Sequence, residues 1–441
     1  MKTWFENKWD SLRTNFWFVP SLMACAAVIL CLAFLHIDKI TGFAIPGIGK
    51  GNLASIRSLL SVLIGAIVTA LSIVFSSTVV VLTLAASQLG PRLLRTYMRA
   101  RSNQLLIGIF IAALFYNLTA LFIIGRLEGD SGIPNLTVLG TFALSCATLV
   151  ILTYFIHHVA RNIQAPNVIL SVANELKSLI LRTYPAEEEI SVPLKDLEKR
   201  DKLLPKKSNS IISPRSGYIQ AVNETGLLQL ARENQVIVKT VHRPGDFVTT
   251  GDELAQIHSE TELETEKATD FSSMFFIGEN RTATQDVEFV LNELVEIALR
   301  ALSPSISDPF TANTCIDRLA EGLSLMSNRI MPDFHKFDDE GKLRVILDQT
   351  DFKGLCNAAF HQIRQHAAGN AAVLIHMLES FGLMMKKTKT NEQLQVLWHH
   401  ARLVRRAAEK LPEQEDLQDV EQRFQELGTH FGFKETKIKK L

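Results

Sequence analysis

Two groups of polar residues in this sequence have types and spacings that could do chemistry. The first is a series of hydroxyl side chains within an otherwise apolar stretch: Ser61, Thr69, Ser72, Ser76, Thr83 and Ser87. Hydroxyls that share one helix face can hydrogen-bond to a neighbouring helix or line a water-filled path for ions. The second group is Arg281 and Asp286, five residues apart in a polar segment. Such a pair can clamp a ligand or act in catalysis.

The hydroxyl series lies in the uncharged stretch 58–91. Its members are mostly three or four residues apart, which places them on one face of a helix. This pattern leaves two interpretations open, since the face could pack against another helix or line a pore in an oligomer. Arg92 and Arg95 follow directly. At the cytosolic mouth of a pore they would favour anions or repel small cations.

Arg281 and Asp286 also have a structural interpretation. Thr282 or Thr284 could cap the helix that follows, while Asp286 complements the N-terminal dipole of that helix. The histidines predict no metal site, because two helical ligands are expected four residues apart. His361 and His366 are five apart, and His399 and His400 are adjacent and so cannot share a helical face. No nucleotide, hydrolase or kinase motif is present. We therefore expect neither enzymatic activity nor a cofactor.

Charge and hydropathy divide the chain in two. The 441 residues contain 46 Lys+Arg and 46 Asp+Glu, a balance that argues against nucleic acid as a partner. Apolar residues concentrate before residue 160, and most charged residues follow it. About twenty apolar residues suffice to cross a bilayer. We predict four spans, at about 16–37, 58–89, 104–125 and 136–156.

The second predicted span is longer than a bilayer requires, so we expect it to tilt, break or continue beyond the membrane. Spans two to four contain no charged residue, which argues against proton- or sodium-coupled transport. Basic residues are enriched in the N-terminal tail and in the second loop. The positive-inside rule then predicts that both termini are cytosolic. Residues 1–15 suit an interfacial helix.

The rest of the chain predicts a cytosolic α+β region. We expect an amphipathic helix and a charged linker in 161–210 and a small β domain in 211–260. A helical domain in 261–432 and a basic tail in 433–441 should follow. The fold class is thus a polytopic α-helical membrane protein with a cytosolic β barrel or sandwich-hybrid domain and a helical domain.

The β segment is similar to the hammerhead of biotinyl-lipoyl domains. Ser213–Gly217 resembles the stretch that opens one half of that fold, and Gly245–Leu254 resembles the turn that opens the other. The Met-Lys-Met hairpin that presents the modified lysine in those domains has no counterpart here. We therefore expect no covalent biotin or lipoyl group.

Four longer stretches resemble a bacterial family of predicted membrane proteins catalogued as a domain of unknown function. They are Ser76–Arg95, Gly217–Gln235, Arg243–Leu254 and Arg281–Ala312. This resemblance implies four spans, a cytosolic C-terminal region and a location in the bacterial cytoplasmic membrane.

Two functions fit these features. The first is an oligomeric, channel-like protein that conducts ions or small solutes passively along the second span and is assembled by its cytosolic domains. The alternative is a non-conducting sensor or assembly scaffold whose cytosolic region binds a ligand or a protein. In both cases the bilayer is a partner, and in the first a homo-oligomer is expected.

Overall fold

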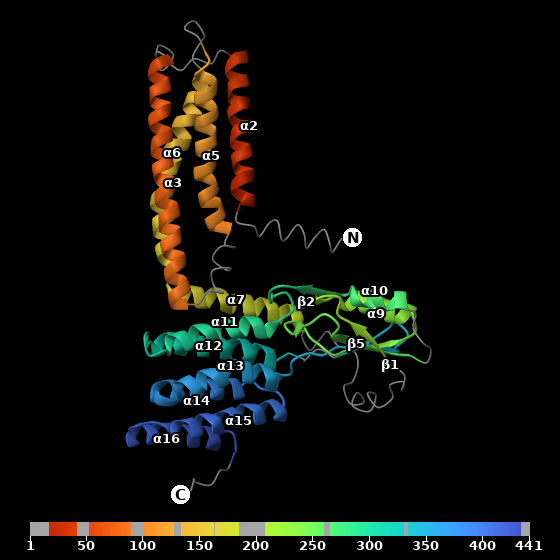
Figure 1. The fold of residues 1–441 in the computed structure, drawn as a ribbon. Helices are drawn as coiled ribbons and strands as arrows, with labels where there is room; N and C mark the ends of the chain where they lie inside the picture. The colour runs from red at the N-terminus through yellow and green to blue at the C-terminus, as the bar shows by residue number, and fades with distance from the viewer. Residues whose placement is uncertain are drawn as a thin grey trace. The chain divides into compact units, whose positions relative to one another are not determined.

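The computed structural model describes residues 17–41, 53–89, 101–127, 134–162, 164–184, 208–259, 265–329 and 334–433 (Figure 1). The chain divides into two compact units, Met1–Asn167 and Val168–Leu441, and we describe each by itself. The predicted interfacial helix, Arg92 and Arg95, most of the predicted charged linker and nearly all of the basic tail lie outside the described residues.

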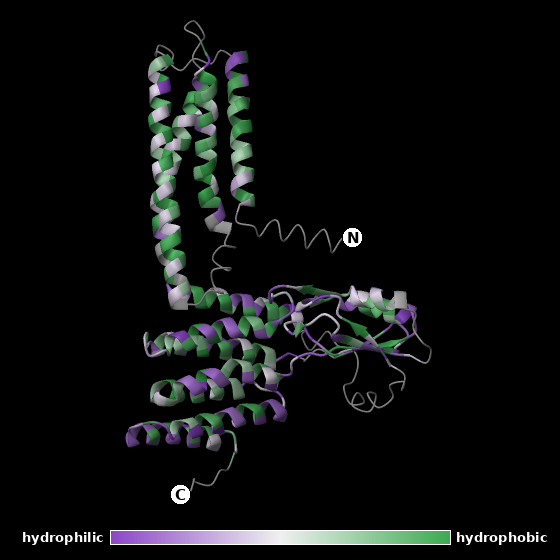
Figure 2. Cartoon of the chain, in the orientation of Figure 1, coloured by the Kyte–Doolittle hydropathy of each residue, from purple (hydrophilic) through white to green (hydrophobic). Residues whose placement is uncertain are grey.

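The N-terminal unit contains four long apolar helices within its described residues: α2 (Phe18–Thr41), α3 (Leu53–Leu89), α5 (Arg101–Ile124) and α6 (Asn135–Asn162). Each is long and apolar enough to cross a membrane, as the four predicted spans require. Hydrophobic residues predominate along most of their length (Figure 2). Helix α5 contacts the other three and is the most buried of them. A buried cluster that includes Cys31, Tyr116 and Ala120 forms part of the core of this unit.

Helix α3 is unbroken over its 37 residues. At 1.5 Å per residue it extends for about 55 Å, well beyond a hydrocarbon core of about 30 Å. Of the three alternatives expected for this span, the structure therefore excludes a break in the helix. It is compatible with a tilted helix and with a helix that continues beyond the membrane.

Two charged side chains complete helix ends in this unit. The Asp38 carboxylate of α2 accepts hydrogen bonds from the backbone N–H groups of Leu136 and Thr137, both at 2.9 Å, at the start of α6. The Arg57 guanidinium of α3 donates to the carbonyl oxygens of Ile124 at 3.1 Å and Leu127 at 2.6 Å, at the end of α5. Each charge has the sign that the helix dipole favours at that end. Both residues thus satisfy backbone groups that the helix ends leave unpaired.

We expect Asp38→Ala to destabilise the N-terminal unit by about 1–2 kcal/mol, because two backbone donors of α6 lose a charged acceptor. Asp38→Asn keeps an acceptor oxygen and should lose less. Thermal unfolding of the full chain in detergent measures both variants. An alanine variant as stable as the wild type would contradict this role.

The C-terminal unit begins with α7 (Ala165–Thr183), which buries one face through Ile169, Val172, Leu176 and Leu179. Two sheets follow. The five-stranded sheet has the order β1-β5-β3-β8-β7 and the three-stranded sheet the order β4-β2-β6. Neighbouring strands are antiparallel except β3 and β8, where Val238 pairs in parallel with Val345. The strands are β1 (Ser208–Ile212), β2 (Gly217–Val222), β3 (Ile237–Thr240), β4 (Phe247–Val248), β5 (Glu253–His258), β6 (Phe275–Gly278), β7 (His335–Phe337) and β8 (Leu343–Ile346).

The sheets extend beyond the predicted β domain, 211–260. Strands β6, β7 and β8 come from the segment that the sequence indicates as helical. They are three or four residues long, which is too short for an alternating pattern to distinguish them from loops. A core that includes Ile219, Val238 and Val345 joins strands of both sheets, β6 and β8 among them, to α9 (Glu224–Glu233) and α10 (Thr265–Ser272).

Stacked helices make up the rest of the C-terminal unit (Figure 1). They are α11 (Val287–Ala301), α12 (Pro309–Ser327), α13 (Phe352–His366), the short η4 (Ala367–Gly369), α14 (Ala371–Met385), α15 (Asn391–Ala408) and α16 (Gln414–His430). A side-chain N-cap hydrogen bond opens most of them, supplied by Asp286, Asp308, Asp351, Asn370 and Thr390. The caps satisfy backbone donors that the first helical turn leaves unpaired.

Candidate functional site

The six hydroxyl residues of α3, which we call the hydroxyl face, all lie on the exposed surface of the N-terminal unit. The buried side of the same helix is formed by Ile56, Leu60, Ile67, Ala70, Val74 and Val81, together with one hydroxyl residue, Thr78. At about 100° per residue, the hydroxyl face is centred roughly 180° from that buried side. Gly65 lies within the hydroxyl face, and a Cβ atom added there would meet nothing within 4 Å. Helix α3 therefore turns its polar side away from its own bundle.

Five of the six hydroxyl protons on this face are bound within α3 itself. Thr69 donates to the carbonyl oxygen of Gly65 at 2.9 Å, and Ser72 donates to that of Val68 at 2.9 Å. Ser61, Thr83 and Ser87 make equivalent bonds to the preceding turn. The remaining lone pairs of these hydroxyl oxygens point outward as acceptors. The face can thus meet water, cations or the donors of another helix.

Arg281 and Asp286 bind each other. The Nε atom of Arg281 lies 2.8 Å and its Nη2 atom 2.7 Å from Oδ2 of Asp286. The other carboxylate oxygen, Oδ1, accepts from the backbone N–H of Phe289 at 2.9 Å, so Asp286 is itself the N-cap of α11. The expectation that Thr282 or Thr284 caps this helix is wrong, because Asp286 directly precedes its first residue. Burial raises the pKa of Asp286, and the Arg281 guanidinium opposes that rise.

The turn before β4 packs closely on this ion pair. Gly245 has a φ of +102°, which favours glycine, and a Cβ atom there would clash with Oδ2 of Asp286. The same atom would lie 2.9 Å from Nη2 of Arg281. The neighbouring Arg243 reaches Glu288 of α11 at 3.2 Å. The Arg281–Asp286 ion pair therefore connects this turn to the start of α11, which gives both charges a structural role.

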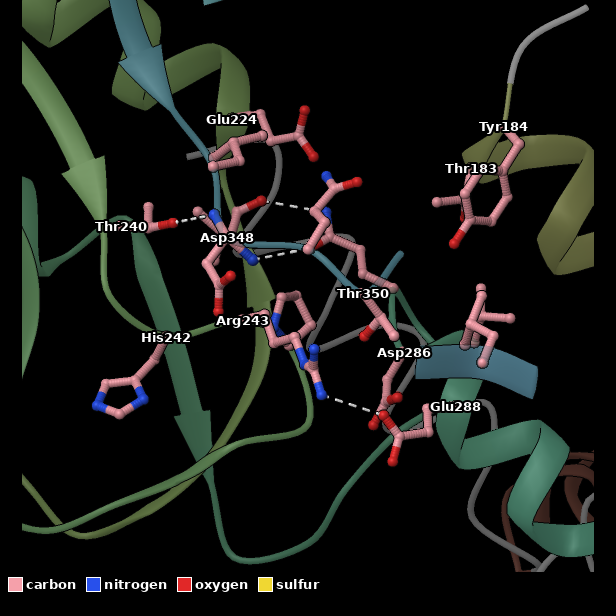
Figure 3. Close-up of a pocket in the computed structure, with 17 residues that line it drawn as sticks. Thr183, Tyr184, Glu224, Thr240, His242, Arg243, Asp286, Glu288, Asp348 and Thr350 are labelled. Carbon is pink, nitrogen blue, oxygen red and sulfur yellow. Dashed lines mark hydrogen bonds and ion pairs between the residues drawn. The ribbon is translucent and has the colours of Figure 1, made fainter. Parts of the chain in front are cut away.

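A cavity of about 70 Å³ lies beside this turn (Figure 3). Six segments converge on it: the end of α7, the end of β2 with the start of α9, the turn after β3, the start of α11, the chain after β8, and α13. Charged or titratable side chains that line it are Tyr184, Glu224, His242, Arg243, Asp286, Glu288 and Asp348. Its volume suits several water molecules or a small polar molecule.

Hydrogen bonds hold the walls of this cavity in place. The backbone N–H of Asp348 donates to Thr240 at 2.6 Å, and Gln285 makes two bonds to the backbone of Val222, at 2.8 and 3.1 Å. Burial raises the pKa of Tyr184 to about 12, so its hydroxyl keeps its proton. Burial also raises the pKa of Asp348, and Arg243 opposes the change. The cavity thus offers both donors and acceptors to a ligand.

Sequence reasoning singled out Asp286 but missed Tyr184, Arg243 and Asp348 as neighbours in one cavity. The sequence indicated a turn at Arg243. It did not indicate that Tyr184, Arg243 and Asp348 are neighbours, because the three residues lie far apart in the chain. Among the residues that the structure describes, no group of three or more His, Cys, Asp or Glu side chains could hold a metal ion. The histidines discussed above form no such group there.

The four apolar helices and the mixed helical and sheet C-terminal region define a polytopic membrane protein. The chain belongs to the family described as "Predicted membrane protein (DUF2254)", whose model matches residues 13–382. The family resemblance carried by the four sequence stretches is thereby confirmed. Curated relatives include uncharacterised proteins of Mycobacterium bovis and Mycobacterium tuberculosis. Each is 29% identical over 383 residues, covering 85% of this chain and 71% of the relative. No solved structure matches the chain.

Proposed function

We propose that this protein is a channel-like homo-oligomer of the bacterial cytoplasmic membrane, with both termini in the cytosol. In this proposal α3 borders a path for the passive movement of ions or small solutes. The observation that carries it is the hydroxyl face, which is exposed along the helix and lies opposite the side that packs in the bundle. The C-terminal unit would hold the subunits together.

Lipid tails offer no hydrogen-bonding groups, so a small, hydroxyl-bearing face gains little from facing them. Against another α3 helix, the same face would allow the close approach that glycine and serine permit. Around an axis it would present hydroxyl oxygens to water, as a hydrated path requires. Arg92 and Arg95 would stand at the cytosolic mouth and favour anions there.

Disulfide cross-linking tests the assembly. In a background in which the exposed Cys25 and Cys146 are alanine, Ser72→Cys should give disulfide-linked dimers when membranes are oxidised. Ile73→Cys is the matched control, because it is exposed on the neighbouring side of the same helix. A Ser72→Cys variant that stays monomeric, or that cross-links no better than the control, would contradict the proposal.

The cavity favours a second candidate, a membrane-anchored sensor that binds a small polar ligand. Its support is the convergence of donors and acceptors at Tyr184, Arg243 and Asp348, which come from three separate segments. A panel of small amines, amino acids and nucleosides can be screened for stabilisation of the full chain against heat. A compound that stabilises the wild type but not Asp348→Ala would support this role. A panel without any such compound would count against it.

We also propose that the protein is not an enzyme acting through Arg281 and Asp286. The support is that each charge is engaged by the other and by the helix start. If the Asp286→Asn variant keeps both the fold and the ion flux described in the Discussion, a catalytic role for this pair is excluded.

A further inference from the structure

Positive and negative charge are separated among the last helices of the C-terminal unit. Helix α13 contains Lys353 and Arg364 but no Asp or Glu, and α15 contains three arginines and a single acid, Glu392. Helix α16 is rich in acidic residues. Helices α13 and α15 contact each other, as do α15 and α16. The basic residues of α15 are therefore placed between a basic and an acidic neighbour.

The side of α15 toward α16 is neutralised. Arg405 is mostly buried and binds Glu421 through two bonds, from Nε at 2.6 Å and from Nη2 at 2.8 Å. Its guanidinium also lies 4.8 Å from the ring centroid of Phe424. Arg405 therefore has a carboxylate partner where α15 meets α16.

Another contact of α15 is with α13. Spacings of three and four residues put His399, Arg402 and Arg406 on one side of α15. On α13, Lys353, His361 and Arg364 share a side in the same way. We call these six residues the basic groove. The rings of His361 and the buried His400, which lies between the two sides, have centroids 5.1 Å apart.

Two buried polar atoms at this contact have no hydrogen-bond partner in the described part of the chain. They are Nε of Arg364 and Nε2 of His400, whose residue is 1% exposed. A buried donor without an acceptor is costly to leave unpaired. Arg364 thus presents a guanidinium edge that the protein itself does not satisfy.

Cations from both helices act on the groups at this edge. Burial lowers the pKa of Arg364, and Arg406 lowers it further. Burial also lowers the pKa of His399, and four cations act in the same direction: Arg402, Lys353, Arg406 and Arg364. Like charges held together in this way repel one another, and a bound anion relieves the repulsion.

We propose that the basic groove binds a phosphate group. Arg364 and Arg406 would grip its oxygens through the paired N–H donors that make arginine a phosphate ligand, and Lys353 would add a point charge. The phosphate could belong to a free compound or to a lipid headgroup. This inference does not depend on the proposed conduction path.

Calorimetry on the full chain in phosphatidylcholine nanodiscs tests the site, with pyrophosphate as the probe for a free compound. Flotation with phosphatidylcholine vesicles, with and without phosphatidic acid, tests a headgroup. We expect at least one probe to bind the wild type. Arg364→Gln and Arg406→Gln should each weaken that binding by about tenfold or more. Arg364→Lys should not restore it, because lysine lacks the paired donors.

Arg318→Gln is the control, since it removes the same charge from α12, where Arg318 binds Glu321 at 2.7 Å. It should keep binding close to that of the wild type. Arg406 is exposed, so its variant reports on the site even if Arg364→Gln fails to fold. The inference is overturned if neither probe binds the wild type. It is also overturned if the folded Arg364→Gln and Arg406→Gln variants bind the probe as tightly as Arg318→Gln does.

Discussion

Replacing Asp286 with alanine should destabilise the C-terminal unit by about 3 kcal/mol, because it leaves Arg281 without its partner and removes the N-cap of α11. Asp286 is 4% exposed, and both of its oxygens are engaged, one by Arg281 and one by Phe289. Urea titration of the full chain, followed by circular dichroism, measures the change.

Two controls separate the contributions of the cap and the ion pair. Asp308 caps α12 by accepting from the backbone N–H of Thr311 at 3.1 Å, and among the described residues it has no arginine partner. Asp308→Ala should therefore cost only about 1 kcal/mol. The double variant Arg281→Met/Asp286→Asn keeps a cap acceptor and removes both charges, so it should recover part of the loss. An Asp286→Ala variant no less stable than Asp308→Ala would show that the ion pair contributes nothing.

His400 should make the C-terminal unit sensitive to acid. Its ring is 1% exposed and lies near Phe360 and Phe381, with both centroids at 6.1 Å. Burial, helped by neighbouring cations, lowers the pKa of His400 from 6.5 to about 3. The unfolded chain therefore binds a proton below pH 6.5 that the folded chain rejects, so the stability from this residue falls as the pH falls. At pH 5 the loss should be roughly 2 kcal/mol.

Comparison of urea titrations at pH 7.5 and pH 5 tests this expectation. His400→Phe keeps an aromatic ring among the phenylalanines and should lose about 2 kcal/mol less than the wild type between the two pH values. His366→Gln is the control, because His366 is an exposed residue at the end of α13, and it should behave like the wild type. Equal acid sensitivity in His400→Phe and the wild type would rule out the assignment to His400.

The elements that could be predicted from the sequence are those with strong local patterns. Uncharged apolar runs of sufficient length indicated the four long helices of the N-terminal unit. Asp308 followed by Pro309 is a typical start of a helix, and the structure places the cap of α12 there. Strands β7 and β8 were missed because they are short and β8 depends on pairing with β3, about a hundred residues earlier.

The candidate sites were predictable only in part, for the same reason. Spacing put the six hydroxyls on one helix face, but only the packing of α3 shows that this face is turned away from the bundle. Asp38 and Arg57 carried no local signal of their role, because the helix ends that they complete lie 98 and 67 residues away. The basic groove likewise requires α13 and α15 to be brought together.

The most direct test of the proposed conduction path is ion flux from proteoliposomes. Wild-type vesicles should release ions faster than protein-free vesicles, and Ser72→Leu/Ser76→Leu should change that rate without loss of assembly. Ile73→Leu/Val80→Leu adds the same residues at exposed positions outside the hydroxyl face, and it should leave the flux unchanged. If wild-type vesicles show no flux under applied voltage, pH gradients or osmotic stress, the proposal is contradicted. A control pair that alters flux as strongly as the serine pair would also contradict it.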